Sequence, residues 1–195
     1  MIDKERWLIA QKGERKYHNR SMEDGLSVYG HGYCDQLFKY VDVDYENLGG
    51  RSILEIGPAD FPALYFCDNF KGYVIEPMDS PILNALSAQK KIVVIKGLAE
   101  EVQFPFVDEI WLFNVLTHVM NSDIIIDKAK GYSNTIRFFE PINTEISIDH
   151  PLKFNIDYYI SKFGNCVKYY PANHNITNFH EHECVYGIYK THHNV

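Results

Sequence analysis

The 195-residue sequence lacks the features that would assign it to a membrane, to the secretory route or to a repeat architecture. It has no run of about 18 apolar residues and no signal-peptide pattern near its first residue. It also has no internal repeat and no low-complexity segment. These absences predict a soluble, cytoplasmic protein without a membrane partner. An apolar content of 46% with 14% aromatic residues argues against disorder and predicts one folded domain.

Paired cysteines and clustered positive charge are missing as well. The four cysteines, at positions 34, 67, 166 and 184, are widely scattered without a C-x-x-C pair, which is typical of reduced thiols. The net charge is −7 and no long basic run occurs, so a surface that tracks nucleic-acid phosphates is disfavoured. The sequence leaves the oligomeric state open.

Residues 52–79 form the most informative segment of the chain. An apolar run over residues 53–56 ends at Gly57, a helix-like stretch follows, and a second apolar run ends in Glu76. This order predicts a strand, a tight turn, a helix and a second strand. Open α/β sheets bind ligands at the carboxyl ends of their strands, and an acid roughly 20 residues after the first turn is placed to accept hydrogen bonds from ribose hydroxyls. The segment therefore predicts a site for an adenosine-containing cofactor.

The turn itself indicates which cofactor. A dinucleotide site needs G-x-G-x-x-G, because backbone must approach a pyrophosphate closely. The loop over residues 57–62 has one glycine, and Asp60 would place a negative charge beside any phosphate. S-adenosylmethionine carries no phosphate and has a cationic sulfonium, so it tolerates these surroundings. The loop favours this cofactor over NAD.

At this point the chain resembles a known family. Residues 55–59, Glu-Ile-Gly-Pro-Ala, are similar to the first motif of the class I S-adenosylmethionine-dependent methyltransferases, an acidic residue followed by a glycine-rich turn. Ala59 and Phe61 stand where that family often has glycines. Four more segments resemble the family in order along the chain: 76–79 its second motif, 92–101 its third strand and loop, 106–119 its fourth strand and the start of the next helix, and 134–141 its fifth strand.

The resemblance implies a fold, a cofactor and an activity. It implies one domain over residues 1–195, a Rossmann-like α/β fold with a seven-stranded, mostly parallel sheet, a reversed terminal strand and helices on both faces. Residues 1–48 would form an N-terminal helical cap. It also implies S-adenosylmethionine as the cofactor and O-, N- or C-methylation of a small-molecule acceptor. The implied cofactor-binding residues are Glu55, Gly57, Pro58, Ala59, Asp60, Glu76, Pro77, Met78, Leu98, Ala99, Glu100, Asn114 and Val115.

Some of these positions have a second interpretation. Asp60 could instead cap the next helix through its side chain, and the side chain of Glu100 could lie in water. Asn114 follows a buried strand and would face the methionine end of the cofactor.

The candidate catalytic residues are His118 and His150. Methyl transfer needs an in-line nucleophile at near-attack distance, and a general base helps only an acceptor that must lose a proton. His118 lies about one helical turn beyond the fourth strand, and His150 lies in the loop after the fifth strand. Either histidine could instead be structural. Tyr17, His18 and Tyr33 could form a lid, with packing as the alternative role.

The histidine-rich tail raises the question of a metal. His180, His182 and Cys184 alternate along an extended segment and could share one face. Nitrogen and thiolate ligands suit zinc, but a spacing of two is not a usual zinc pattern, and Cys184 leads into an apolar strand. We therefore expect no metal.

Three missing motifs narrow the chemistry. No Asn/Asp-Pro-Pro-Tyr sequence and no Pro-Cys pair follow the fourth strand, which argues against amino-methylation of DNA bases and against cytosine carbon-5 chemistry. No G-x-S-x-G elbow supports a hydrolase. Two alternatives stay open: a non-catalytic cofactor-binding or scaffold subunit, and an NAD-dependent oxidoreductase, which the missing glycines and a terminal hairpin disfavour.

The remaining patterns predict further elements. They are an N-terminal amphipathic helix over residues 1–20, a loop from Gly25 to Gly32, a helix over 33–41, a helix over 155–163 that Gly164 stops, and two closing strands at 167–170 and 184–189.

Overall fold

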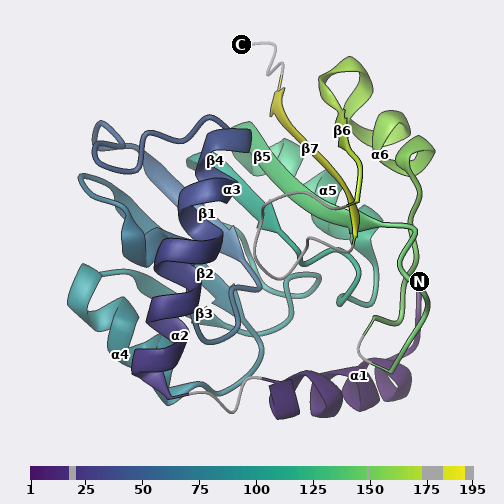
Figure 1. The fold of residues 1–195 in the computed structure, drawn as a ribbon, viewed down its shortest axis with the longest axis horizontal. Helices are drawn as coiled ribbons and strands as arrows, with labels where there is room; N and C mark the ends of the chain where they lie inside the picture. Colours follow the sequence, from purple (N-terminus) through teal and green to yellow (C-terminus); the bar gives the residue numbers. More distant parts are fainter. Residues whose placement is uncertain (18–20, 149, 173–181, 192–195) are drawn as a thin grey trace.

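The structure of the protein is a computed structural model that describes residues 1–17, 21–148, 150–172 and 182–191. Its centre is a seven-stranded sheet in the order β3-β2-β1-β4-β5-β7-β6 (Figure 1). All neighbouring strands are parallel except β7, which is antiparallel to both β5 and β6. The predicted mostly parallel sheet with a reversed terminal strand is confirmed. The strands are β1 (Ser52–Ile56), β2 (Lys71–Glu76), β3 (Val93–Lys96), β4 (Val107–Phe113), β5 (Ser133–Ile142), β6 (Lys168–Tyr170) and β7 (Glu183–Lys190).

Six α-helices and three short helical turns accompany the sheet in the described part of the chain. None of these helices combines the length and apolar content needed to cross a bilayer. The helices are α1 (Lys4–Tyr17), α2 (Met22–Val28), α3 (Asp35–Tyr40), α4 (Pro81–Lys90), α5 (Ser122–Tyr132) and α6 (Ile156–Phe163). The turns are the π-helical η1 (Tyr29–Cys34) and the 3-10 turns η2 (Ala63–Phe66) and η3 (Gly164–Cys166).

Two apolar cores lie on the two faces of the sheet, because successive side chains of a strand point to opposite faces. Leu112 of β4 and Phe138 of β5 pack in the core that includes residues of α5 and α6. Their neighbours Trp111 and Phe139 pack in the core that includes residues of α3 and α4. Both faces are thus covered, which explains why the central strands read as nearly continuous apolar runs.

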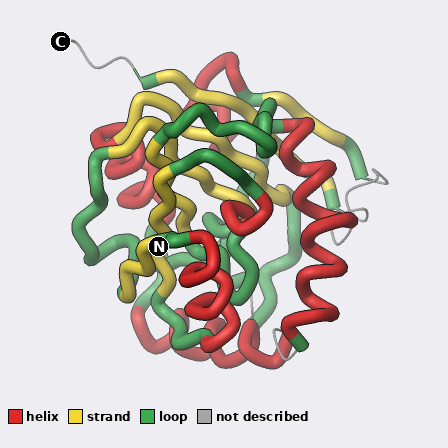
Figure 2. Tube along the Cα trace, turned by 90° about the vertical axis from the view of Figure 1, so that its left-hand side faces the viewer, coloured by secondary structure: helices red, strands yellow, loops and turns green. Residues whose placement is uncertain are grey.

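Residues 22–40 form one continuous helical run of α2, η1 and α3, seen along one side of the sheet (Figures 1 and 2). The predicted loop from Gly25 to Gly32 is therefore wrong. Ser21 caps α2 by accepting the Asp24 N–H (3.1 Å), so the helix starts before the glycines. Gly25 is a packing position: a Cβ there would lie 1.8 Å from the ring of Phe61.

The crossovers contain less helix than the sequence pattern predicted. Between β1 and β2 only the four residues of η2 are helical, because extended backbone at Pro62 and Cys67 bounds the segment on both sides. After β4, residues 114–121 make turns and α5 starts at Ser122, where the Asn121 side chain accepts the Asp123 N–H (3.1 Å). The predicted helix starts at both places are wrong, although the strands before them are confirmed.

The helical run over residues 22–40 packs into the core that includes Trp111 and Phe139. Leu37 and Phe38 of α3 are buried against β1 and β4 residues. Beside them the buried Glu109 carboxylate accepts from Arg137 Nε (2.7 Å), and Arg137 Nη1 donates to the Asp42 carbonyl (2.8 Å). This pair joins the end of α3 to β4 and β5. In contrast, α1 lies beyond the carboxyl ends of the strands (Figure 1).

Candidate functional site

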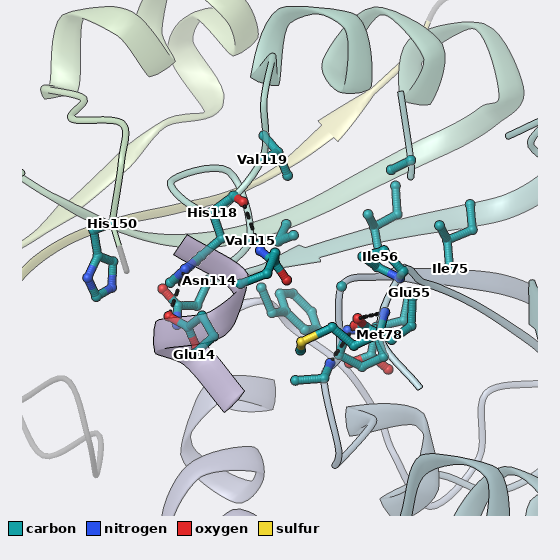
Figure 3. Close-up of a pocket in the computed structure, with 18 of the residues that line it drawn as sticks. Glu14, Glu55, Ile56, Ile75, Met78, Asn114, Val115, His118, Val119 and His150 are labelled. Carbon is teal, nitrogen blue, oxygen red and sulfur yellow. Dashed lines mark hydrogen bonds and ion pairs between the residues drawn. The ribbon is translucent and has the colours of Figure 1, made fainter. Parts of the chain in front are cut away.

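A cavity of about 580 Å³ opens at the carboxyl ends of β1, β2 and β4, the edge where open α/β sheets bind ligands. All of the predicted cofactor-binding and catalytic residues line it except Asp60. Residues of α1 and of the loop after β5 close its other side (Figure 3). We call the side built from the strand ends the cofactor half, and the side built from α1, His118 and the described residues of the loop after β5 the acceptor half.

The turn after β1 requires a glycine. Gly57 has a φ of +66°, a conformation that side chains with a Cβ rarely adopt. A Cβ at this position would also lie 2.4 Å from Cγ2 of Val115, which follows β4. The two loops therefore pack directly against each other on the floor of the cavity. Two residues later Ala59 also has a positive φ, +54°, in the same loop.

Glu76 at the end of β2 holds the turn in place. Its Oε2 accepts the Ala59 N–H and its Oε1 accepts the Met78 N–H, both at 2.9 Å. The side chain is buried yet lines the cavity. A carboxylate offers about four acceptor sites, so these two bonds are compatible with the predicted bonds to ribose hydroxyls.

Two further carboxylates hold neighbouring loops by accepting hydrogen bonds from their backbone N–H groups. Glu55 accepts the N–H groups of Ala63 (2.9 Å) and Leu64 (3.1 Å), and burial raises its pKa to about 7. Glu140, which the sequence analysis did not single out, accepts the N–H groups of Val115 (3.0 Å) and of the next residue. Burial raises its pKa to about 8. Glu55 lines the cavity, and the hydrogen bonds that it accepts from Ala63 and Leu64 position η2.

Asp60 lies away from the cavity, and Glu100 lines it while also holding a neighbouring loop. Asp60 accepts a hydrogen bond from the hydroxyl of Ser80, the N-cap of α4, so it neither lines the cavity nor caps the next helix, η2. Glu100 is half-buried and lines the cavity, and its Oε1 accepts the N–H groups of Met120 (2.8 Å) and Asn121 (3.1 Å). It therefore fixes the loop that leads into α5.

Asn114 presents a polar group to the cavity. Its backbone N–H donates to the Phe139 carbonyl (2.8 Å) and its φ is +54°, a value that asparagine tolerates better than most residues. Its side-chain Oδ1 is buried and has no hydrogen-bond partner among the described residues. A buried acceptor in this state fits a site that a ligand donor completes.

The acceptor half brings both predicted catalytic histidines together with an acid from α1. His118 Nδ1 lies 3.0 Å from Glu14 Oε1, and the rings of His118 and His150 have centroids 4.5 Å apart (Figure 3). Burial and the neighbouring His118 lower the pKa of His150 to about 4. Glu14 belongs to α1, and nothing in the local sequence marks it as a site residue.

Side-chain donors of α1 attach it to this half of the cavity. Trp7 Nε1 donates to the His118 carbonyl (3.1 Å), and Arg6 Nη1 donates to the Ile148 carbonyl (2.9 Å). Within the loop, the His150 N–H donates to Ser147 Oγ (3.0 Å). The position of Glu14 relative to both histidines follows from these contacts.

Of the predicted lid and tail residues that the structure describes, some line the cavity and one lies in the core. Tyr33 is buried, lines the cavity and packs edge-on against Tyr29, with ring centroids 5.6 Å apart. His18, His180 and the Tyr17 side chain lie outside the described residues. His182 lines the cavity, whereas Cys184 is buried in the core.

Comparison with solved structures shows which known fold the chain has. No family model matches the chain, and no curated protein matches it. A chain of the Haloferax volcanii complex that contains the Trm112 methyltransferase activator superposes with a TM-score of 0.62 at 11% identity, covering 99% of this chain and 100% of that one. A SAM-dependent methyltransferase from Aquifex aeolicus gives 0.57 at 11%, covering 83% and 92%. An O-methyltransferase from a Brevibacillus brevis polyketide synthase, in complex with S-adenosylhomocysteine, gives 0.61 at 13%, covering 80% and 72%.

The chain has the class I S-adenosylmethionine-dependent methyltransferase fold. The fold matches the resemblance found in the sequence, and at these identities the likeness is one of fold. The methyltransferase fold places the glycine turn, Glu76 and Asn114 around one cavity whose far end holds the two histidines.

Proposed function

We propose that this protein binds S-adenosylmethionine in the cofactor half of the cavity and transfers its methyl group to a small-molecule acceptor held in the acceptor half. The observation that carries the proposal is the continuity of the cavity. A single space of about 580 Å³ connects Glu76 and Asn114 with His118 and His150. Cavities of this size suit small ligands.

The cofactor half offers a partner for each part of the cofactor. Glu76 would accept hydrogen bonds from the ribose hydroxyls, with Pro77 and Met78 beside the adenine. Leu98 and Ala99, both buried in the cavity wall, would form the apolar side of the adenine pocket. The unsatisfied Oδ1 of Asn114 supports a bond from the ammonium group at the methionine end.

The chemistry proposed is an in-line displacement. A lone pair of the acceptor oxygen or nitrogen attacks the methyl carbon, the carbon–sulfur bond breaks, and the sulfur keeps its electron pair as the neutral thioether of S-adenosylhomocysteine. An acceptor hydroxyl must also lose its proton. His118, held by Glu14 at 3.0 Å, is positioned to receive it, and His150 borders the same space. Positioning supplies much of the acceleration in such a reaction.

Calorimetric titration with S-adenosylhomocysteine tests the proposal. Wild type should bind, and Asn114→Gly should bind about tenfold more weakly, because it removes the side-chain acceptor and keeps a backbone that tolerates positive φ. Glu76→Gln should also weaken binding. A suitable control is Glu101→Gln, an exposed change outside the cavity, which should bind as wild type.

The outcomes separate the alternatives. Absence of binding, with no thermal stabilisation by S-adenosylhomocysteine, would overturn the proposal. Stronger stabilisation by NAD would revive the oxidoreductase interpretation. Binding without turnover across a broad panel of hydroxyl and amine acceptors would favour a non-catalytic cofactor-binding subunit. Turnover that releases S-adenosylhomocysteine only when an acceptor is present would establish the methyltransferase.

A further inference from the structure

The acceptor half contains a cluster of metal-binding side chains that the methyl-transfer chemistry does not by itself require. Glu14, His118 and His150 each offer one ligand atom, and the three atoms all lie within 4.8 Å of one another. All three side chains are half-buried and face the cavity (Figure 3). Within the described part of the chain this is the one group of three or more such residues with that spacing.

The ligand types fit a transition metal. Two imidazole nitrogens and one carboxylate oxygen form a set that binds zinc, cobalt, nickel or iron in their divalent states, whereas magnesium and calcium prefer oxygen ligands alone. A tetrahedral zinc ion with ligands at about 2.1 Å keeps its donor atoms roughly 3.4 Å apart. Glu14 Oε1 and His118 Nδ1, at 3.0 Å, are already near this separation.

We propose that Glu14, His118 and His150 bind one divalent transition-metal ion, with zinc the favoured occupant. The three ligands come from α1, from the turn after β4 and from the loop after β5, so only the folded chain assembles the site. Contacts other than the three ligands fix these segments: Trp7 holds the turn, Arg6 holds the loop, and Ser147 bonds the His150 backbone. Small rotations of side chains would close the remaining gap to His150.

Three protein ligands leave one position of a tetrahedral zinc ion open, and here that position would face the cavity. An acceptor hydroxyl bound there would be acidified by the ion and would release its proton to water. In the metal-bound protein this release replaces proton transfer to His118, whose imidazole would be a ligand. This use of the open position rests on the proposed function, whereas metal binding itself does not. From the sequence we expected no metal, because the only metal-binding pattern visible there was that of the histidine-rich tail.

The test is a calorimetric titration with zinc of the full-length protein after treatment with a chelator. Variants are Glu14→Gln, His118→Asn, His150→Asn and the triple variant. Removing a group that merely supports a metal ligand costs about 10–100-fold in affinity, so loss of a ligand should raise the Kd about 100-fold or more. The chain has nine histidines, and the seven outside the cluster could bind zinc nonspecifically. Binding that persists in the triple variant measures this background.

Two controls keep the result interpretable. Glu5→Gln removes an exposed acid from the same helix and should retain the wild-type affinity. Circular dichroism would verify that every variant is folded. The cobalt-loaded wild type should show the strong visible absorption of a four- or five-coordinate ion, and the triple variant should not.

Equal zinc affinity and stoichiometry in wild type and the triple variant would overturn the proposal, as would the absence of binding to wild type. Titration of the same proteins with S-adenosylhomocysteine distinguishes the two proposals. Cofactor binding without zinc binding leaves the methyltransferase function standing with Glu14 and His118 as a hydrogen-bonded pair. Zinc binding without cofactor binding overturns the proposed function and leaves the metal site standing.

Discussion

The two halves of the cavity are built in different ways. In the cofactor half, buried carboxylates accept backbone N–H groups of the loops: Glu55 holds η2, Glu76 holds the Gly57 turn, and Glu140 holds the turn after β4. In the acceptor half, long side chains of α1 donate to backbone carbonyls, as Arg6 does to Ile148 and Trp7 to His118.

This difference has a physical consequence. If a buried carboxylate moved away, the N–H groups that it binds would stay buried without an acceptor, which is costly. The loops of the cofactor half are therefore held in place without a ligand. The bonds of Arg6 lie at the surface, where water can replace them at little cost. The strand-end loops are therefore held by buried bonds, whereas the loop over residues 143–148 is held to α1 by exposed ones.

The largest effect should follow removal of the Glu140 carboxylate. Glu140→Ala leaves the N–H groups of Val115 and Leu116 buried without an acceptor, and each such group costs about 1–3 kcal/mol. We expect the free energy of unfolding to fall by about 3 kcal/mol and S-adenosylhomocysteine binding to weaken. In Glu140→Gln one amide oxygen can still accept both groups, so this variant should retain most of the stability. Denaturant unfolding measures both, and equal stability of the two variants would refute the argument.

A smaller effect should follow from crowding the Gly57 turn. Gly57→Ala places a Cβ 2.4 Å from Cγ2 of Val115 at a φ of +66°. We expect a loss of about 2 kcal/mol in stability, from the backbone strain and the overlap together. Val115→Ala removes the overlapping methyl group, so the double variant should recover the part due to overlap. A double-mutant cycle measures this coupling, and strict additivity would show that strain alone accounts for the loss.

The same carboxylates predict how stability depends on pH. Burial raises the pKa of Glu55 to about 7 and that of Glu140 to about 8 in the folded protein, so the folded state holds these protons more tightly than the unfolded state does. The resulting contribution to the free energy of unfolding is complete below a pH of about 4.5, the ordinary pKa of glutamate. It is lost as the pH rises to about 8. Each group adds at most about 1.4 kcal/mol per pH unit. Glu140→Gln should flatten the decline, and an unchanged slope would contradict it.

The smallest effect should come from the acceptor half. Arg6→Ala removes exposed bonds to the carbonyls of Ser147 and Ile148, so the free energy of unfolding should change by at most about 1 kcal/mol. Hydrogen exchange of residues 143–148 should accelerate, while exchange at the ends of β1 and β2 and the affinity for S-adenosylhomocysteine stay unchanged. Loss of cofactor affinity in this variant would show that the two halves are not independent.

The sequence was most informative where a short segment carries its own chemistry. The strands at residues 52–56 and 71–76 and the turn at Gly57 follow from local apolar runs and one glycine, and all three are present in the structure. It failed at Gly25, where the glycine serves a packing contact with Phe61 that lies far along the chain. It also failed between the first two strands, where only η2 is helical.

In the candidate site, too, some residues follow from the local sequence and others do not. The cofactor half could be predicted because its residues lie within a few positions of strand ends, and strand ends can be read from apolar periodicity. Asp60 is the exception: its carboxylate turns toward Ser80, which comes from the next crossover. Glu14 and Glu140 could not be predicted, because each acts on a segment more than 20 residues away.

The sequence by itself determined the order of the strands along the chain, the glycine turn and the acid at the end of β2, because these depend on neighbours within a few residues. Only the tertiary structure decided which carboxylates support the loops and which side chains meet across the cavity. Glu14 reaches His118 because Trp7 and Arg6 attach α1 to segments more than 100 residues away, and no local pattern encodes that contact.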